Sequence, residues 1–165
     1  MKINFLLLLV VLFISCSKKE REQKEESAVT TVAVANDLPA LQIKLLDGKI
    51  VDGKQLTTPA ALILFQPDCD HCQREATQIQ TNLQAFKNYT LYFVSSAPEP
   101  GILKFSEEYR LAGKENVLFG WTTTENIINT FGPIDAPSVY LYSREGKLIQ
   151  SFNGEVDISV ILKYL

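Results

Sequence analysis

The stretch that decides the fold runs from Leu62 to Gln78 and reads Leu-Ile-Leu-Phe-Gln-Pro-Asp-Cys-Asp-His-Cys-Gln-Arg-Glu-Ala-Thr-Gln. Its first four residues form an apolar run with the length and flanking residues typical of a buried strand. A short turn leads into the pair Cys69 and Cys72, and a helical pattern begins directly afterwards. The unpaired N–H groups and positive dipole end of a helix N-terminus favour a thiolate, so this arrangement indicates a reactive site.

The first residues of the chain are predicted to be a targeting signal. Met1 and Lys2 give a positively charged start, and an unbroken run of ten apolar residues extends from Phe5 to Ile14. That run is shorter than the ~20 residues of a membrane-spanning helix and fits the apolar region of a secretory signal. The sequence therefore predicts that the folded domain leaves the cytosol.

The end of this run, Phe13-Ile14-Ser15-Cys16, resembles a bacterial lipoprotein signal, in which a small residue precedes a lipidated cysteine. The resemblance implies a signal peptide over residues 1–15 and a lipid anchor on Cys16, with the domain in the periplasm. An ordinary signal peptide or an uncleaved anchor is the alternative. Residues 17–27 carry four basic and four acidic side chains and no apolar one. We interpret residues 16–36 as a polar tether and residues 37–165 as the folded domain.

Composition and cysteine count narrow the function. The 165 residues are 46% apolar and 21% charged, with a formal net charge of -3, which does not suggest a nucleic-acid binder. With Cys16 assigned to the lipid, Cys69 and Cys72 are the only cysteines left, and they can pair only with each other. A disulfide that closes so short a loop stabilises a fold by only ~2 kcal/mol. Redox chemistry explains the pair better than structural stapling.

Hydrophobic periodicity predicts an α/β domain. Strands that alternate with helices indicate a mixed sheet covered on both faces. The helix that starts at Asp70 is predicted to run for four to five turns to Phe86, with Glu75 among its surface positions. The predicted elements are a hairpin at 39–56, strands at 61–65, 91–94 and 117–119, a loop at 95–101, helices at 70–86, 102–109, 122–131 and 158–165, and a second hairpin at 138–152. A capping box, Thr122 to Glu125, is expected to open the third helix.

The segment from Phe65 to Gln73 resembles the active site of thioredoxin-fold proteins, and more closely that of the membrane-anchored, AhpC/TSA-related oxidoreductases of the TlpA/ResA type. Two further segments carry the resemblance, the Asp-Gly-Lys-x-Val hairpin at 47–51 and the stretch from Ile134 to Lys147. The resemblance implies a thioredoxin-like three-layer sandwich with an added N-terminal hairpin. It also implies a cis peptide bond at Pro137, where Ala136 and Pro137 would bind substrate.

The same resemblance implies an extracytoplasmic enzyme that exchanges thiols and disulfides with proteins of the cell envelope. Cys69 would attack as a thiolate and form a mixed disulfide, which Cys72 would resolve. A membrane redox partner would recycle the enzyme, the lipid on Cys16 would hold it to the membrane, and no bound cofactor is expected.

Neighbouring residues bear on the reactivity of the pair. A protonated His71 would stabilise the Cys69 thiolate, whereas Asp68 and Asp70 act in the opposite direction. In thioredoxin a buried Asp precedes the first cysteine by six residues, and Ile63 stands at that position here. Glu75 is a substitute proton acceptor by hypothesis, although its simpler interpretation is a carboxylate on the helix surface.

Two other functions fit the same residues. A metal-handling module could carry copper through Cys69, Cys72 and His71. A structural zinc site needs four ligands, and the mature domain offers only these two thiols and one imidazole. A thioredoxin-fold peroxidase is the second alternative, although the single-cysteine motif of such enzymes is not visible.

Overall fold

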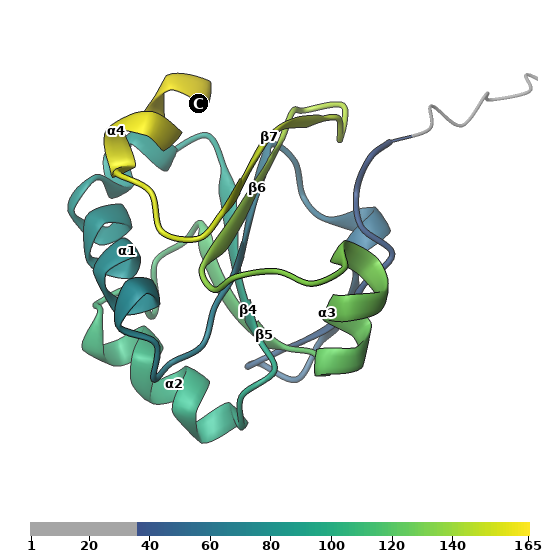
Figure 1. The fold of residues 1–165 in the computed structure, drawn as a ribbon, viewed down its shortest axis with the longest axis vertical. Coiled ribbons are helices and arrows are strands. Elements are labelled where there is room, and N and C mark those ends of the chain that lie inside the picture. Colours follow the sequence, from purple (N-terminus) through teal and green to yellow (C-terminus); the bar gives the residue numbers. More distant parts are fainter. Residues whose placement is uncertain (1–35) are drawn as a thin grey trace, which may run out of the picture. The chain divides into compact units, whose positions relative to one another are not determined.

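A seven-stranded mixed sheet is the centre of the structure, a computed structural model that describes residues 36–165 (Figure 1). The predicted signal peptide and all of the predicted tether except residue 36 lie outside the described residues. The strand order is β2-β1-β5-β4-β3-β6-β7, and β3, β4 and β5 are mutually parallel. The strands are β1 Gln42–Leu45, β2 Ile50–Asp52, β3 Ala60–Leu64, β4 Thr90–Ser95, β5 Val117–Trp121, β6 Ser138–Tyr142 and β7 Leu148–Asn153.

Helices cover both faces of the sheet, as predicted. On one face lie α1, α2 and α4, and α3 packs on the other together with the segment before β1 (Figure 1). The helices are α1 Asp70–Thr81, α2 Glu99–Glu108, α3 Thr124–Phe131 and α4 Ile158–Ile161, with 3₁₀ turns at Gly53–Gln55, Leu83–Phe86 and Leu162–Tyr164. None of the helices in the described part of the chain is long and apolar enough to span a membrane.

Strand β3 lies in the middle of the sheet and leads directly to the predicted reactive site. All five of its residues are buried, because it pairs with β4 on one side and β6 on the other and is covered on both faces. Full burial of a Leu or Ile side chain contributes about 1.5–3 kcal/mol to stability. The strand therefore gives the segment that follows it a rigid base.

The first helix is shorter than predicted. It ends at Thr81 because Asn82 caps it: both the backbone N–H and the side-chain amide of Asn82 donate to the carbonyl of Gln78. The apolar pattern continues through a 3₁₀ turn, and Phe86 is buried as expected. The periodicity thus identified Phe86 as a buried side chain but did not identify the end of the helix.

Two other helix starts also differ from the prediction. Helix α2 begins inside the predicted loop, at Glu99, because Pro98 precedes it and Pro100 stands in its first turn, where a missing N–H costs nothing. Helix α3 is capped by Thr123, whose hydroxyl accepts the Asn126 N–H at 3.0 Å. The hydroxyl of the predicted cap, Thr122, instead donates to the Gln42 carbonyl of β1 at 2.7 Å.

The N-terminal hairpin joins the sheet at β5, as an addition to its edge. β1 pairs antiparallel with β5 at Gly120, which lies directly against β1. A Cβ atom at Gly120 would come within 2.5 Å of Ile43 Cγ2 and 3.1 Å of the Lys44 carbonyl oxygen. Only glycine allows β1 and β5 to approach this closely.

Candidate functional site

Cys69 lies at the N-terminus of α1, where the sequence predicted a reactive thiol. It is the N-cap residue of the helix, and its Sγ accepts a hydrogen bond from the Cys72 N–H at 3.4 Å. Its own N–H donates to the Gln66 carbonyl at 3.2 Å, which closes the turn after β3. The Cys69 side chain is half-buried and the thiols are free, so the structure is that of the dithiol. A thiolate at this position would receive a helix N–H and the positive end of the helix dipole.

The loop before β6 brings Ala136 and Pro137 to this thiol. The Ala136–Pro137 peptide bond is cis, in agreement with the prediction. The Cys69 thiol donates to the Ala136 carbonyl at a sulfur–oxygen distance of 3.5 Å. Asn153, at the end of β7, fixes the loop because its Oδ1 accepts the Asp135 N–H at 2.8 Å. The loop before β6 therefore meets the start of α1 at Cys69, and β7 holds that loop in place.

Cys72 lies beneath Cys69, inside the first turn of α1. Its side chain is only 2% exposed, and its Sγ accepts the Gln66 N–H at 3.5 Å. Burial raises the pKa of the Cys72 thiol far above its ordinary value, and the neighbouring Cys69 and Glu75 act in the same direction. The two thiols thus differ in access: one faces solvent and the other is enclosed by the core.

Glu75 is buried, which corrects the prediction that it lies on the helix surface. It is 1% exposed, and neither of its carboxyl oxygens has a hydrogen-bond partner. Burial raises its pKa to about 8, a shift that the nearby Val156 N–H opposes and the Glu155 carboxylate strengthens. The physical reason for its burial is helical spacing, because Glu75 follows Cys72 by three residues and shares its face of α1. An uncharged acid therefore lies beside the enclosed thiol at neutral pH.

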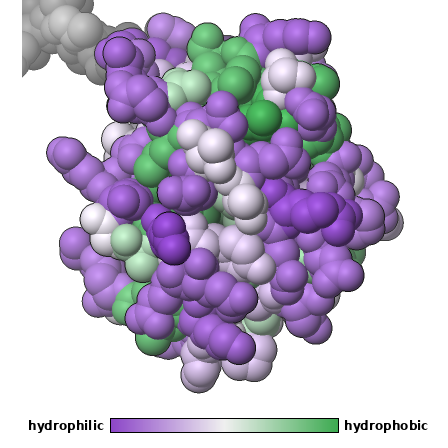
Figure 2. All heavy atoms as spheres, turned by 90° about the vertical axis from the view of Figure 1, so that its left-hand side faces the viewer, coloured by the Kyte–Doolittle hydropathy of each residue, from purple (hydrophilic) through white to green (hydrophobic). Residues whose placement is uncertain are grey.

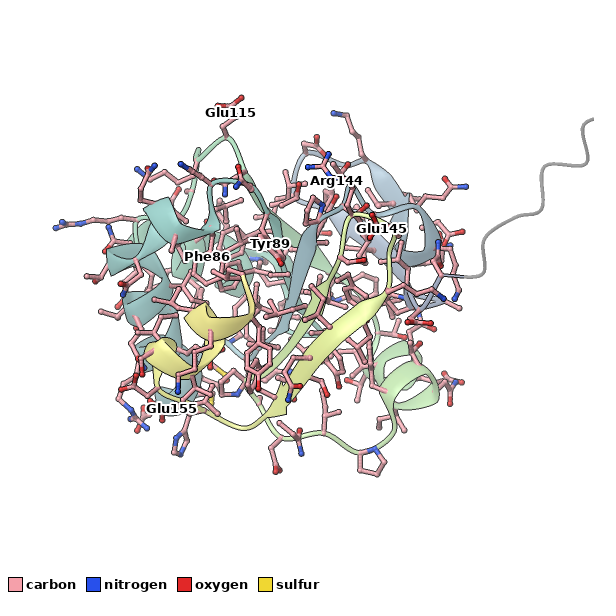
Figure 3. The ribbon with its side chains drawn as sticks, turned by 90° about the horizontal axis from the view of Figure 1, so that it is seen from above. Phe86, Tyr89, Glu115, Arg144, Glu145 and Glu155 are labelled. Carbon is pink, nitrogen blue, oxygen red and sulfur yellow. The ribbon has the colours of Figure 1, made fainter. Side chains whose placement is uncertain are left out.

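His71 is directed away from Cys69, to a cluster at the molecular surface. Its Nδ1 lies 2.7 Å from Glu155 Oε2 and 2.8 Å from Arg74 Nη2. Arg74 also holds the Glu155 carboxylate with two hydrogen bonds, of 2.9 and 2.6 Å. These bonds from Arg74 and His71 lower the pKa of Glu155 to about 2. Figure 3 shows Glu155 beside α1 and α4. No hydrogen bond joins His71 to Cys69 in the described residues.

Glu155 and Gln66 both adjoin the site, although the sequence alone predicted no role for either residue. Glu155 follows His71 by 84 residues, and no local pattern indicates that distant contact. The Gln66 N–H donates to the Cys72 Sγ and its carbonyl accepts the Cys69 backbone N–H, while its side-chain amide bonds to the hydroxyls of Ser95 and Ser96. The only feature of the sequence that could have indicated a role for Gln66 is its position between the buried strand and Cys69.

Comparisons with known proteins identify the fold of the chain. No protein-family model and no curated protein sequence matches the chain. Among solved structures, DsbF of Mycobacterium tuberculosis aligns with a TM-score of 0.64 at 20% identity, over 76% of this chain and 92% of that one. The chain has the thioredoxin-like fold. A secreted disulfide oxidoreductase of the same organism is described as homologous to Escherichia coli DsbE. It aligns with a TM-score of 0.64 at 19% identity, over 76% of this chain and 93% of that one. StoA from Bacillus subtilis aligns with a TM-score of 0.58 at 14% identity, over 74% of this chain and 93% of that one.

The thioredoxin-like fold confirms the predicted fold class, including the mixed sheet with its added N-terminal hairpin. The metal alternative gains no support from the geometry. Within residues 36–165, no three His, Cys, Asp or Glu side chains are grouped so that they could hold a metal ion. The third ligand that this alternative requires, His71, is engaged by Glu155 and Arg74.

Proposed function

We propose that the protein is a thiol–disulfide oxidoreductase in which Cys69 is the attacking cysteine and Cys72 the resolving one. The observation that carries this proposal is the pairing of a half-exposed N-cap thiol with an enclosed thiol one turn later. An exposed thiol that receives a helix N–H is suited to attack a protein disulfide. The secreted Mycobacterium tuberculosis protein, which has the same fold, is described as a disulfide oxidoreductase.

The reaction follows from thiol exchange. The Cys69 thiolate attacks one sulfur of a partner disulfide, that S–S bond breaks, and the other partner sulfur leaves as a thiolate and takes up a proton. A mixed disulfide now joins Cys69 to the partner. The Cys72 thiolate then attacks Cys69 Sγ, which releases the second partner thiol. Two electrons have passed from the Cys69–Cys72 dithiol to the partner, and the reverse sequence oxidises partner thiols.

Glu75 is the residue that we assign to proton transfer at Cys72. Cys72 must lose its proton before it can attack, yet burial holds its pKa high. Ile63, at the position of the thioredoxin Asp, is a core residue that cannot accept a proton. Glu75 is buried on the same face of α1, and its raised pKa of about 8 is close to the range that a general base requires.

We further propose that the domain acts outside the cytosol, anchored by a lipid on Cys16. The sequence signal at residues 1–15 and the polar composition of residues 16–36 support this part of the proposal. The domain at 37–165 would then meet envelope proteins that carry thiols or disulfides, and a membrane redox partner would recycle it. Replacement of Cys16 by Ala should move the protein from the membrane fraction to the soluble fraction. Retention in the membrane fraction would contradict lipid anchoring.

The central test measures the reduction potential of the Cys69–Cys72 pair and the rate of insulin reduction. Cys69→Ser should abolish insulin reduction, and Cys72→Ser should accumulate a mixed disulfide that denaturing electrophoresis detects. A potential close to about -270 mV would identify a reductant, and one close to about -120 mV an oxidant. Activity that persists in Cys69→Ser would overturn the assignment of the attacking thiol. Stoichiometric copper that stays bound without any dithiol exchange would favour the metal alternative.

A further inference from the structure

Gln66 lies just beyond the end of β3, between that strand and the two thiols. The backbone pairing of β3 with β4 ends one residue earlier, where the Phe65 N–H donates to the Val94 carbonyl at 3.1 Å. The Gln66 N–H donates instead to Cys72 Sγ, at a nitrogen–sulfur distance of 3.5 Å. The direction of this N–H therefore depends on what holds the backbone at Gln66 in place of strand pairing.

The side chain of Gln66 provides that hold. Its Nε2 donates to Ser96 Oγ at 3.0 Å, and its Oε1 accepts the Ser95 hydroxyl at 3.3 Å. Ser95 Oγ in turn accepts the Ala97 N–H at 3.1 Å, so the three bonds run in one direction. Ser95 is the last residue of β4, and Ser96 follows it. The amide thus fastens the segment before Cys69 to the end of the neighbouring strand.

Ser95 gives this anchor a rigid base. It is fully buried, and its carbonyl accepts the Thr122 N–H at 3.0 Å. Polar side chains predominate at the surface, for example on the face that α1 and α2 form (Figure 2), whereas few lie in the described core. Burying a hydroxyl costs free energy unless it is hydrogen-bonded. The Ser95 hydroxyl offsets this cost through Ala97 and Gln66, which links its place in the core to the segment before the thiols.

The Gln66 N–H bears on the second step of the proposed exchange. Cys72 must attack as a thiolate, and burial opposes its ionisation. Among the described groups that act on the pKa of Cys72, the Gln66 N–H is the one that lowers it. A hydrogen bond to a charged sulfur is stronger than one to a thiol, so this N–H stabilises the attacking form selectively. Because hydrogen bonds weaken with misalignment, a change in the direction of the N–H would reduce that stabilisation.

We propose that the Gln66 amide is a positioning group, held by Ser95 and Ser96. It aims the backbone N–H at the Cys72 sulfur and so sets the rate at which Cys72 resolves the mixed disulfide. This inference rests on the proposed exchange function and adds a positioning role to its second step. In that step Cys72 attacks Cys69 Sγ, the mixed disulfide breaks, and the partner sulfur leaves as a thiolate. The Gln66 side chain itself takes up no proton and no electron.

Reduction of dithiobis(nitrobenzoate) by the full-length protein separates the two steps. Every variant carries Cys16→Ala, so that Cys69 and Cys72 are the only thiols. The Cys69 thiolate breaks the disulfide of the reagent and releases one coloured nitrothiobenzoate, while the other stays bound to Cys69. Cys72 then attacks Cys69 and releases the second. Stopped-flow absorbance should show a first phase whose rate rises with reagent concentration and a second phase that does not depend on it.

Gln66→Met keeps the volume of the side chain and removes its amide. The first phase should stay within about twofold of the wild type, and the second should be about tenfold slower. Ser96→Ala removes one bond of the amide and should slow the second phase about threefold, whereas Ser96→Thr keeps the hydroxyl and should match the wild type. The double variant Gln66→Met, Ser96→Ala should be no slower than Gln66→Met alone, because both changes break the same bond.

Asn116→Leu is the matched control for the loss of a structural amide. Asn116 is half-buried like Gln66, and its Nδ2 donates to the carbonyls of Phe86 and Tyr89 at 3.0 Å each. It directly precedes β5, at the opposite end of the parallel strands from Cys69. The control should lower the urea midpoint of unfolding and leave both phases unchanged.

The pH profile of the second phase separates positioning from general damage to the site. In Gln66→Met the rate should still rise towards about pH 8, because Glu75 stays buried. A midpoint that moves towards 4.5 would show that Glu75 has become solvated, and the slowing would then be structural.

Two other results would overturn the positioning role and leave the exchange function standing. One is equal slowing of both phases in Gln66→Met, and the other is a second phase as fast as that of Asn116→Leu. If Gln66→Met does not fold, Ser96→Ala decides, and a wild-type second phase in that variant refutes the role. Rapid release of nitrothiobenzoate in Cys69→Ser would instead overturn the exchange mechanism itself.

Discussion

Replacement of Glu75 by Gln should stabilise the protein and impair its chemistry. The buried carboxyl has its pKa raised from 4.5 to about 8. Between these pH values the native state holds a proton that the unfolded state has lost, so stability falls as the pH rises through this window. At ~1.4 kcal/mol per pH unit, the free energy of unfolding falls, relative to its value below pH 4.5, by about 3 kcal/mol at pH 7 and by about 5 kcal/mol above pH 8.

The amide in Glu75→Gln cannot ionise, so the variant avoids this loss. Urea unfolding of the reduced proteins at pH 5, 7 and 8.5, followed by the fluorescence of the sole tryptophan, Trp121, measures the difference. The variant should exceed the wild type by an amount that grows with pH. Glu115→Gln, which removes an exposed carboxylate, serves as the control for loss of charge. A variant that is less stable than the wild type at pH 8.5, or a gap that does not grow with pH, would refute the reasoning.

The catalytic effect of the same substitution has the opposite sign. Resolution of the mixed disulfide requires proton removal from Cys72, and Glu75 can accept that proton only after it has lost its own. The wild-type resolution rate should therefore rise with pH towards about 8, the pKa of Glu75. In Glu75→Gln the rate should be lower and this rise should disappear. Exchange with a peptide disulfide, quenched at intervals, measures the lifetime of the mixed disulfide.

Three further predictions follow from the geometry. Iodoacetamide should alkylate Cys69 alone in the reduced native protein at pH 8, and Cys72 only after denaturant is added, as peptide mapping will show; rapid modification of both would contradict the enclosure of Cys72. Glu155→Gln should lower the urea midpoint of unfolding at neutral pH because Arg74 and His71 lose their carboxylate partner, and salt should narrow the difference from wild type. Because the Glu155 pKa is depressed, the wild type should lose this contribution as the pH falls from about 4.5 towards 2, where the two midpoints should converge. Gly120→Ala should lower the free energy of unfolding in urea by about 1–3 kcal/mol through overpacking, and an unchanged value would disprove the close approach of the strands.

Local patterns were sufficient to predict an α/β domain with a mixed sheet and the position of the thiols, whereas the thioredoxin-like fold itself came from the family resemblance. A buried run, a turn and a helical period over residues 62–78 specify a strand, a loop and a helix whose N-terminus carries Cys69, because each step depends on neighbours in the chain. The cis bond before Pro137 came from a family resemblance. The ends of helices were harder to predict from the sequence. The end of α1 depends on a cap at Asn82, and the start of α2 depends on prolines, which also occur in loops.

Contacts between distant segments could not be predicted. The sequence assigned His71 to Cys69 because the two residues are close in the chain, whereas the structure directs His71 to a glutamate 84 residues away. That contact depends on how the loop after β7 returns to α1, and no local pattern encodes its path.

Glu75 shows why a correct pattern was nonetheless misinterpreted. Cys72, Glu75, Ala76 and Ile79 occupy one stripe of α1, and all four are buried. The sequence prediction placed Glu75 on the surface because a glutamate is charged, although Glu75 lies three residues after Cys72 and four before Ile79 on the buried stripe. Within the described residues no ion pair, and only the nearby Val156 N–H, offsets the cost of burying this carboxyl, so packing and stability do not explain its presence. The proposed exchange reaction gives a reason to keep an acid in the core at such a cost, because the neighbouring Cys72 thiol must lose a proton.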